Sequence, residues 1–192
     1  MVKFGTGVLT DSHKQPDPAQ LEQLVAQIAA LRLSGREVVV VTSGAVGAGM
    51  GALGYKTRPT DLAEKQACAA VGQSRLMAVY DQLFAKHGLV VAQVLLTHDD
   101  LEHHERHLNA RNTLVTLLNR GVVPIINEND AVSFTEIKFG DNDKLSALVA
   151  SLLPADLVGL TTLIALRSGD FFTSLVNPND TGKASGLMKL VF

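Results

Sequence analysis

The sequence predicts an α/β protein, a three-layer αβα sandwich with a mostly parallel central sheet. Short apolar runs alternate along the chain with longer stretches of helical, amphipathic spacing. The runs at 38–41 (VVVV) and 122–126 (VVPII) contain no polar residue, which is typical of strands covered on both faces. Strands separated by helices join through right-handed crossovers, so neighbouring strands become parallel and helices cover both faces of the sheet.

Periodicity and glycine positions define the elements expected in the first part of the chain. Leu21, Leu24 and Ile28 recur at helical spacing, and Gly35 ends that helix. The many glycines between 43 and 54 predict an irregular connection. The expected elements are a strand at 3–4, a turn at 5–7, a helix at 16–34, a strand at 38–41, the glycine-rich connection at 43–54 and a helix at 61–87.

The second part of the chain repeats the alternation of strands and helices. Gly121 ends a helical stretch directly before the apolar run at 122–126. The expected elements are a strand at 89–96, a helix at 99–119, a strand at 122–126, an irregular hairpin at 131–140, a helix at 141–153 and a strand at 157–160. In such sheets the ligand site lies at the carboxyl ends of the strands, and we therefore look for chemistry there.

Composition sets limits on the class of protein. The 192 residues predict one domain over 1–192, and 46% hydrophobic with only 5% aromatic residues favours a layered α/β core. A formal net charge of −2 gives no basic excess for nucleic acid or anionic lipid, and no apolar run is long enough to span a membrane. Lys3 interrupts any signal peptide, and Cys68, the single cysteine, is expected to be a buried apolar residue. We expect a cytoplasmic protein.

Two strand ends carry residues suited to anions. Lys3 precedes a glycine turn, so its ammonium can reach a phosphate lying over the turn, although a surface lysine is the plainer interpretation. After the second strand, residues 42–49 (TSGAVGAG) allow close approach of a ligand to the backbone, or simply close helix packing. No Gly-Lys-Ser/Thr sequence closes this segment, so it is not a P-loop.

Two further strand ends carry clusters of carboxylates and amides. Residues 127–130 (NEND) follow a buried strand, where four polar residues are costly unless they form a turn or bind something. Asp130 offers a countercharge to a ligand ammonium, and Asn127 a side-chain amide. Residues 141–143 (DND) begin the next helix; N-capping accounts for one of them but not for all three.

The motifs together resemble the glutamate 5-kinase family of the amino-acid kinase superfamily in order and spacing. The resemblance covers residues 2 to about 162, and the pair NEND and GDND is its most specific part. The matching segments are 2–6 (VKFGT), 41–45 (VTSGA), 69–74 (AAVGQS), 108–113 (LNARNT), 123–130 (VPIINEND) and 140–143 (GDND). The resemblance implies the amino-acid kinase fold.

The resemblance also implies a reaction, its cofactors and its partners. Members of this family transfer the γ-phosphoryl group of ATP, with Mg²⁺, to the side-chain carboxylate of L-glutamate, which is the first step of proline biosynthesis. It further implies feedback inhibition by proline, a homo-oligomer with Leu76 and Met77 near a subunit contact, and a possible glutamyl phosphate reductase that takes the product. A segment similar to residues 131–139 covers glutamate in the family.

The resemblance assigns expected roles to individual residues. Lys3 and Asp143 are the expected catalytic residues, with Lys3 on the transferring phosphoryl group and Asp143 organising Lys3 or the metal region. The expected metal ligands stay open. The expected substrate-binding residues are Ser43, Gly44, Ala45, Asn127, Asp130 and Asn142, and the expected nucleotide-binding residues are Lys3, Gly5, Thr6, Thr162 and Lys189.

The match to the family ends near Thr162, and three alternatives stay open. The nucleotide-binding half beyond it is incomplete, which favours the hypothesis that residues after Thr162 join separate segments of a longer chain. The chain is an active kinase, a non-catalytic amino-acid-binding relative, or an amino-acid kinase for another acidic substrate. His103 and His107 have metal-ligand spacing on a helix, but without a second cluster a solvated face is favoured.

Overall fold

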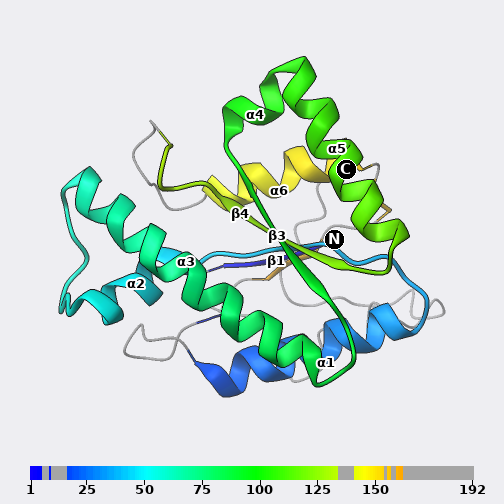
Figure 1. Cartoon of the computed structure of the whole chain (residues 1–192), viewed down its shortest axis with the longest axis horizontal. Helices are drawn as coiled ribbons and strands as arrows, with labels where there is room; N and C mark the ends of the chain where they lie inside the picture. The colour runs from blue at the N-terminus through cyan, green and yellow to red at the C-terminus, as the bar shows by residue number, and fades with distance from the viewer. Residues whose placement is uncertain (6–8, 10–16, 134–140, 154, 157–158, 162–192) are drawn as a thin grey trace, which may run out of the picture.

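A computed structural model describes residues 1–5, 9, 17–133, 141–153, 155–156 and 159–161 of the chain (Figure 1). Strands and helices alternate along it, as the periodicity predicts. In chain order they are β1 (Val2–Phe4), α1 (Pro18–Leu33), β2 (Val40–Val41), α2 (Ala45–Leu53), α3 (Leu62–Ala85), β3 (Val91–Leu96), α4 (His98–Glu102), α5 (His104–Asn119), β4 (Val123–Glu128), α6 (Asp141–Leu152) and β5 (Gly159–Thr161).

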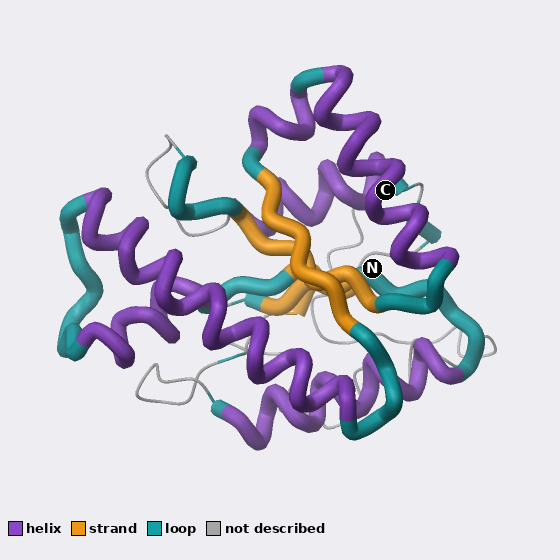
Figure 2. The backbone as a smooth tube through the Cα atoms, viewed as in Figure 1, coloured by secondary structure: helices purple, strands orange, loops and turns teal. Residues whose placement is uncertain are grey.

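The strands of the described residues form one parallel sheet of five strands in the order β3-β4-β2-β1-β5. Lys3 pairs in register with Val41, and Val41 pairs with Ile126. All strands point the same way, so their carboxyl ends meet at one edge of the sheet. The strands run through the middle of the molecule, with helices on either side (Figure 2). The predicted αβα sandwich with a parallel sheet is confirmed.

One face of the sheet packs against α1 and α3. Val2 and Phe4 of β1 point to this face, and alternate residues of the neighbouring strands join them because side chains alternate along a strand. This core is completed by the apolar stripes of the two helices. Its buried members include Leu24, Val25, Ile28, Val40, Leu76, Tyr80, Phe84, Val123 and Ile125.

The opposite face packs against α4, α5 and α6. The side chains of Val41 and Ile126 point to this side, because the residue before each of them in its strand belongs to the first core. Lys3 lies between Val2 and Phe4 in β1, so its side chain points to the face opposite theirs, which α6 covers. The buried apolar members here are Val39, Val41, Leu96, Leu101, Ala110, Leu114, Ile126, Leu145, Val149 and Leu152.

The prediction of a glycine-rich connection at 43–54 is wrong for most of that range, because residues 45–53 form helix α2. Glycines lower helix propensity, but here they allow close packing against α3. A methyl group on Gly49 would lie 1.8 Å from the carbonyl oxygen of Cys68. Tertiary packing therefore stabilises a helix that local propensity disfavours. Cys68 itself is buried, as expected.

Two other boundaries also differ from prediction. The helix expected at 99–119 is divided into α4 and α5, because His103 has extended backbone angles (φ −84°, ψ 120°). Thr97 and Asp100 form a capping box that starts α4. Strand β4 continues through Glu128, so Asn127 and Glu128 belong to the strand and alternate in direction instead of forming a turn after it.

Some predictions fall outside the described residues. These are the greater part of the hairpin expected at 131–140 and the hypothesis of joined segments after Thr162. Within the part of the chain that the structure describes, no helix is both long and apolar enough to cross a membrane.

Candidate active site

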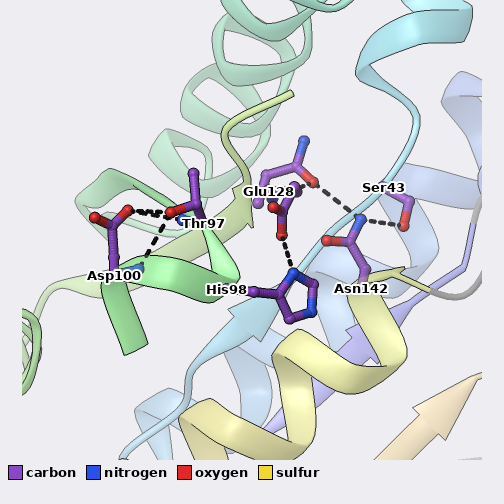
Figure 3. A network of polar contacts seen from close by, with 7 residues as sticks. Ser43, Thr97, His98, Asp100, Glu128 and Asn142 are labelled. Carbon is purple, nitrogen blue, oxygen red and sulfur yellow. Dashed lines mark hydrogen bonds and ion pairs between the residues drawn. The ribbon is translucent and has the colours of Figure 1, made fainter. Parts of the chain in front are cut away.

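Asn142, Ser43 and Asn127 come together at the carboxyl edge of the sheet from three separate elements. Nδ2 of Asn142, in the first turn of α6, donates to Oγ of Ser43 at 2.8 Å and to Oδ1 of Asn127 at 3.1 Å. Figure 3 shows the first of these contacts, with Asn142 projecting from α6 toward Ser43. Parallel strands bring these residues, 99 and 15 positions apart in sequence, to one point.

Lys3 and Asp143 form an ion pair beside this network. Nζ of Lys3 lies 2.5 Å from Oδ1 of Asp143, which follows Asn142 in α6. Lys3 is buried within β1, whereas the side chain of Asp143 is 54% exposed. The pair therefore holds a buried cation at the sheet edge, next to a carboxylate that solvent reaches.

The turn between β2 and α2 supplies backbone groups at the same edge. Gly44 is the N-cap of α2 and has φ of 103°, a left-handed conformation that favours glycine. Because the first amides of a helix have no partner within the helix, the start of α2 near Ala45 is suited to an anion. Ser43 and Ala45 on either side of Gly44 are buried.

A cavity of about 220 Å³ opens on the α3 side of this edge. Ala45 and Asp130, two of the expected substrate residues, line it; Lys3, Ser43 and Asn142 do not. The remaining lining residues are Ala69, Ala70, Gln73, Ser74, Gln93, Leu95, Glu128, Asn129 and Ala131. Asp130 lies at the same edge of the sheet as Lys3, because Lys3 is near the carboxyl end of β1 and Asp130 follows β4, which runs in the same direction.

Asn127 connects the cavity with the Ser43–Asn142 contact. Its Nδ2 donates to Oε1 of Gln73 at 2.8 Å, and Nε2 of Gln73 donates to Oε1 of Gln93 at 3.0 Å. Sequence reasoning assigned no role to these two glutamines. Gln73 lies within the AAVGQS segment, so the resemblance carried a signal there, whereas nothing in the sequence singles out Gln93.

His98 is a further polar residue at this edge that sequence reasoning missed. Its Nδ1 lies 3.5 Å from Oε2 of Glu128, and both side chains are largely buried. Figure 3 shows the imidazole between Glu128 and α6. Nε2 of His98 is buried and has no hydrogen-bond partner among the described residues. The side chain of Glu128 thus points toward α4, whereas that of Asn127 points toward α3.

The remaining expected site residues are placed only in part. Gly5 directly follows β1 and is half-buried. Thr6, Thr162 and Lys189 lie outside the described residues, as does the segment 134–139 of the expected substrate cover. Among the described residues, no group of three or more His, Cys, Asp or Glu side chains is arranged to hold a metal ion. His103 lies at the α4–α5 junction, and Nδ1 of His107 contacts the carbonyl of Leu101.

Comparison with known proteins gives this geometry a context. The profile of the amino acid kinase family matches residues 1–165. The chain belongs to the amino acid kinase family. It is 56% identical over 162 residues to a glutamate 5-kinase of Marinomonas sp. (strain MWYL1), covering 84% of this chain and 43% of that protein. It is 54% identical over 171 residues to a glutamate 5-kinase of Azoarcus sp. (strain BH72), covering 88% and 46%.

A third similar protein is the glutamate 5-kinase of Methylococcus capsulatus, 54% identical over 162 residues. This amino acid kinase chain thus spans a little under half the length of these relatives. The similarity confirms the resemblance to glutamate 5-kinases that the motifs indicate. The family match over residues 1–165 includes Lys3, Ser43 and Asn127 on the strands or their ends and Asn142 at the start of α6.

Proposed function

We propose that this chain binds L-glutamate and takes part in its ATP-dependent phosphorylation to glutamyl 5-phosphate, the first step of proline biosynthesis. The observation that carries this proposal is the meeting of the Lys3–Asp143 pair with the Ser43–Asn142–Asn127 network at one sheet edge. The names of the relatives support the choice of substrate and phosphoryl donor.

The chemistry needs positioning and charge neutralisation more than proton transfer. A glutamate side chain is already ionised near pH 7, so its carboxylate oxygen attacks the γ-phosphorus without a general base. The bond from that phosphorus to the bridging oxygen of ADP breaks, and ADP leaves with the electron pair. Charge on the transferring phosphoryl oxygens is stabilised by fixed cations and amides.

In this proposal Lys3 supplies the fixed cation. Its ammonium is buried at the sheet edge and held by Asp143, so its position changes little when a phosphoryl group arrives. Asp143 acts by holding Lys3. Gly5 and Thr6, which follow β1, together with Thr162 and Lys189, are the proposed further contacts of the nucleotide.

Glutamate has three charged groups, and the site offers a partner for each kind. Asp130 carries the negative charge suited to the ammonium and lines the cavity together with Ala45, the first residue of α2. Ser43 and the amides after Gly44 are suited to a carboxylate. Asn127 and Asn142 add neutral hydrogen-bonding groups that fix the orientation of the substrate.

Mg²⁺ is proposed to arrive with ATP. Mg²⁺ keeps several waters and binds through one or two carboxylates plus substrate phosphates, so it needs no cage of protein ligands. The half-exposed carboxylate of Asp143, beside Lys3, fits such a contribution. The metal would neutralise phosphate charge next to the Lys3 ammonium.

Regulation, assembly and location are further parts of the proposal. Inhibition by proline, a homo-oligomer, transfer of the product to a glutamyl phosphate reductase and a cytoplasmic location all follow from the resemblance. Leu76 belongs to the chain's own core and Met77 packs against it. A subunit contact on α3 would therefore use its exposed residues, such as Val79.

The test is formation of an acyl phosphate that depends on both substrates. Hydroxylamine converts such a product into a hydroxamate, and we expect signal only when L-glutamate, ATP and Mg²⁺ are all present. Binding of glutamate without any hydroxamate would identify a non-catalytic amino-acid-binding protein and overturn the kinase proposal. Equal activity with L-aspartate would overturn the substrate.

The role of Asp130 is tested by Asp130→Asn. Loss of the countercharge should weaken glutamate binding by about 1.5–3 kcal/mol, while ATP affinity stays unchanged. The matched control is Asp81→Asn, which removes an exposed carboxylate from α3. Unchanged glutamate affinity in Asp130→Asn would exclude the proposed role.

A further inference from the structure

The AAVGQS segment at 69–74 has no part in the function proposed above, yet the structure places it against the site. A methyl group on Gly72 would lie 1.7 Å from the carbonyl oxygen of Ala45, so α3 crosses the start of α2 with backbone contact. This close crossing brings the next residue, Gln73, to the sheet edge. Gln73 is only 8% exposed, which is unusual for a glutamine.

Gln73 lies in the middle of a chain of side-chain amides. Asn142 donates to Asn127, Asn127 donates to Gln73, and Gln73 donates to Gln93. The four residues come from α6, β4, α3 and β3. A single row of hydrogen bonds therefore links the Ser43–Asn142 contact to the lining of the cavity.

Which residue donates and which accepts in each hydrogen bond of this row follows from one backbone N–H group, which can only donate. The backbone N–H of Glu128 donates to Oδ1 of Asn127 at 3.0 Å, and a backbone N–H cannot accept. Oδ1 of Asn127 must therefore face Glu128 and Asn142, and its Nδ2 must face Gln73. Gln73 then presents Oε1 to Asn127, which leaves Nε2 to donate to Gln93.

The same argument determines which end of Asn142 is left over. Its two amide hydrogens go to Ser43 and to Asn127. Its Oδ1 is buried and has no hydrogen-bond partner among the described residues. A buried acceptor without a donor is costly, so this oxygen is suited to a ligand that brings an N–H group. The ammonium of an amino acid is such a group.

We infer that Gln73 is a positioning residue of the substrate site, acting on Asn142 through Asn127. By accepting the Asn127 amide, Gln73 keeps Asn127 Oδ1 turned toward Asn142 and so keeps Asn142 Oδ1 free for the substrate. Without that acceptor, Nδ2 of Asn127 would be buried with no partner and the side chain would turn to find one. The identity of the substrate as glutamate rests on the proposed function; the coupling of Gln73 to Asn142 does not.

Gln73→Met and Gln73→Glu separate the hydrogen bond from the space that the side chain fills. Methionine keeps the length but removes the strong acceptor, whereas glutamate keeps an oxygen for Nδ2 of Asn127. In Gln73→Glu the amide of Gln93 can turn and donate to the new carboxylate. Leu76→Val is the control, because Leu76 is buried one turn further along α3 in the apolar core.

The first readout needs no ligand. In NMR spectra of the full chain, the side-chain amide signals of Asn127 and Asn142 should move in Gln73→Met, and return toward their wild-type positions in Gln73→Glu. Leu76→Val should leave them in place. Unchanged Asn142 signals in a folded Gln73→Met protein would overturn the inference, whatever the chain binds.

The second readout is titration with L-glutamate and with ATP. We expect Gln73→Met to weaken glutamate binding about tenfold or more, because small misplacement of a positioned group is costly, while ATP binding stays unchanged. An equal loss for both ligands would indicate general damage and overturn the positioning role. Moved Asn142 signals together with a wild-type chain that binds no glutamate would sustain the coupling and overturn the proposed function instead.

Discussion

The ammonium nitrogen of Lys3 lies 2.5 Å from Oδ1 of Asp143, joining strand β1 to helix α6. The two partners differ in environment, since Lys3 is buried in the sheet and Asp143 is largely open to water. Solvent screens such a pair, so its contribution to stability is small. Its main effect is to fix where the cation lies.

Asp143→Asn should therefore separate function from stability. We expect the free energy of unfolding to change by less than about 1 kcal/mol. We expect hydroxamate formation to slow by about tenfold or more, because the Lys3 ammonium loses its fixed position. Activity assays and urea unfolding followed by circular dichroism measure the two effects.

The control for that variant is Glu22→Gln. The Lys86–Glu22 pair has the same 2.5 Å separation, but both partners are exposed and Glu22 lies on α1. This substitution should leave hydroxamate formation unchanged. If Asp143→Asn also leaves the rate of hydroxamate formation unchanged, Asp143 does not organise the catalytic lysine.

Contact between α2 and α3 depends on two glycines. Methyl groups at Gly49 and Gly72 would lie 1.8 Å and 1.7 Å from backbone carbonyl oxygens of the facing helix. Gly49→Ala or Gly72→Ala should each destabilise the protein by about 1–3 kcal/mol, because the helices must separate. Gly47→Ala is the control on α2, since nothing lies within 4 Å of its added methyl group. Gly47→Ala should leave the free energy of unfolding unchanged or raise it by up to about 1 kcal/mol. A similar loss of stability in all three variants would refute the packing argument.

Tyr80 stabilises the loop that carries Ser43. Its hydroxyl lies 2.7 Å from Oγ1 of Thr42, which itself donates to the carbonyl of Ser43, so Tyr80 is the donor to Thr42. Burial raises the pKa of the Tyr80 hydroxyl, so this group stays protonated and able to donate. Tyr80→Phe should lower the free energy of unfolding by about 0.5–1.5 kcal/mol in urea titrations. Tyr55→Phe, at a half-buried site, should lower the free energy of unfolding by less. Equal losses of stability in the two variants would contradict this account.

The start of α4 should make stability depend on pH. Burial alone would raise the pKa of Asp100, but hydrogen bonds from the backbone and side chain of Thr97, and the Arg106 guanidinium, together lower it below the ordinary value of 3.8. A lowered pKa means that Asp100 stabilises the fold fully above 3.8 and loses this effect as pH falls through its folded pKa. Asp100→Asn should cost about 1 kcal/mol at pH 7.

Unfolding titrations from pH 7 downward test this dependence. The difference in free energy of unfolding between wild type and Asp100→Asn should shrink as the pH falls below 3.8. It should vanish below the folded pKa of Asp100, where both side chains are neutral. Asp99→Asn, in the same first turn but exposed, is the control and should show little effect at any pH. If the stability difference between wild type and Asp100→Asn stays constant with pH, the charge of Asp100 is not the cause of that difference.

The sequence by itself determined the layered fold and the edge of the sheet at which the proposed site residues meet. Uninterrupted apolar runs such as 38–41 are stable only when both faces of the strand are covered, and the helical segments between the strands supply that cover on either side of a parallel sheet. Parallel strands end at a common edge, so polar residues after β2, at the end of β4 and at the start of α6 were expected to approach one another. For that reason Ser43, Asn127 and Asn142 could be grouped before any coordinates.

Tertiary structure alone decided how those members are connected. Helix α2 forms because its glycines meet α3, a contact between segments that no local propensity reports. The alternation of side chains along β4 turns Asn127 toward Gln73 and Glu128 toward His98, and a shift of the strand register by one residue would reverse the two faces. Hydrogen-bond direction depends on such geometry, so the role of Gln73 emerged only when four elements were placed around it.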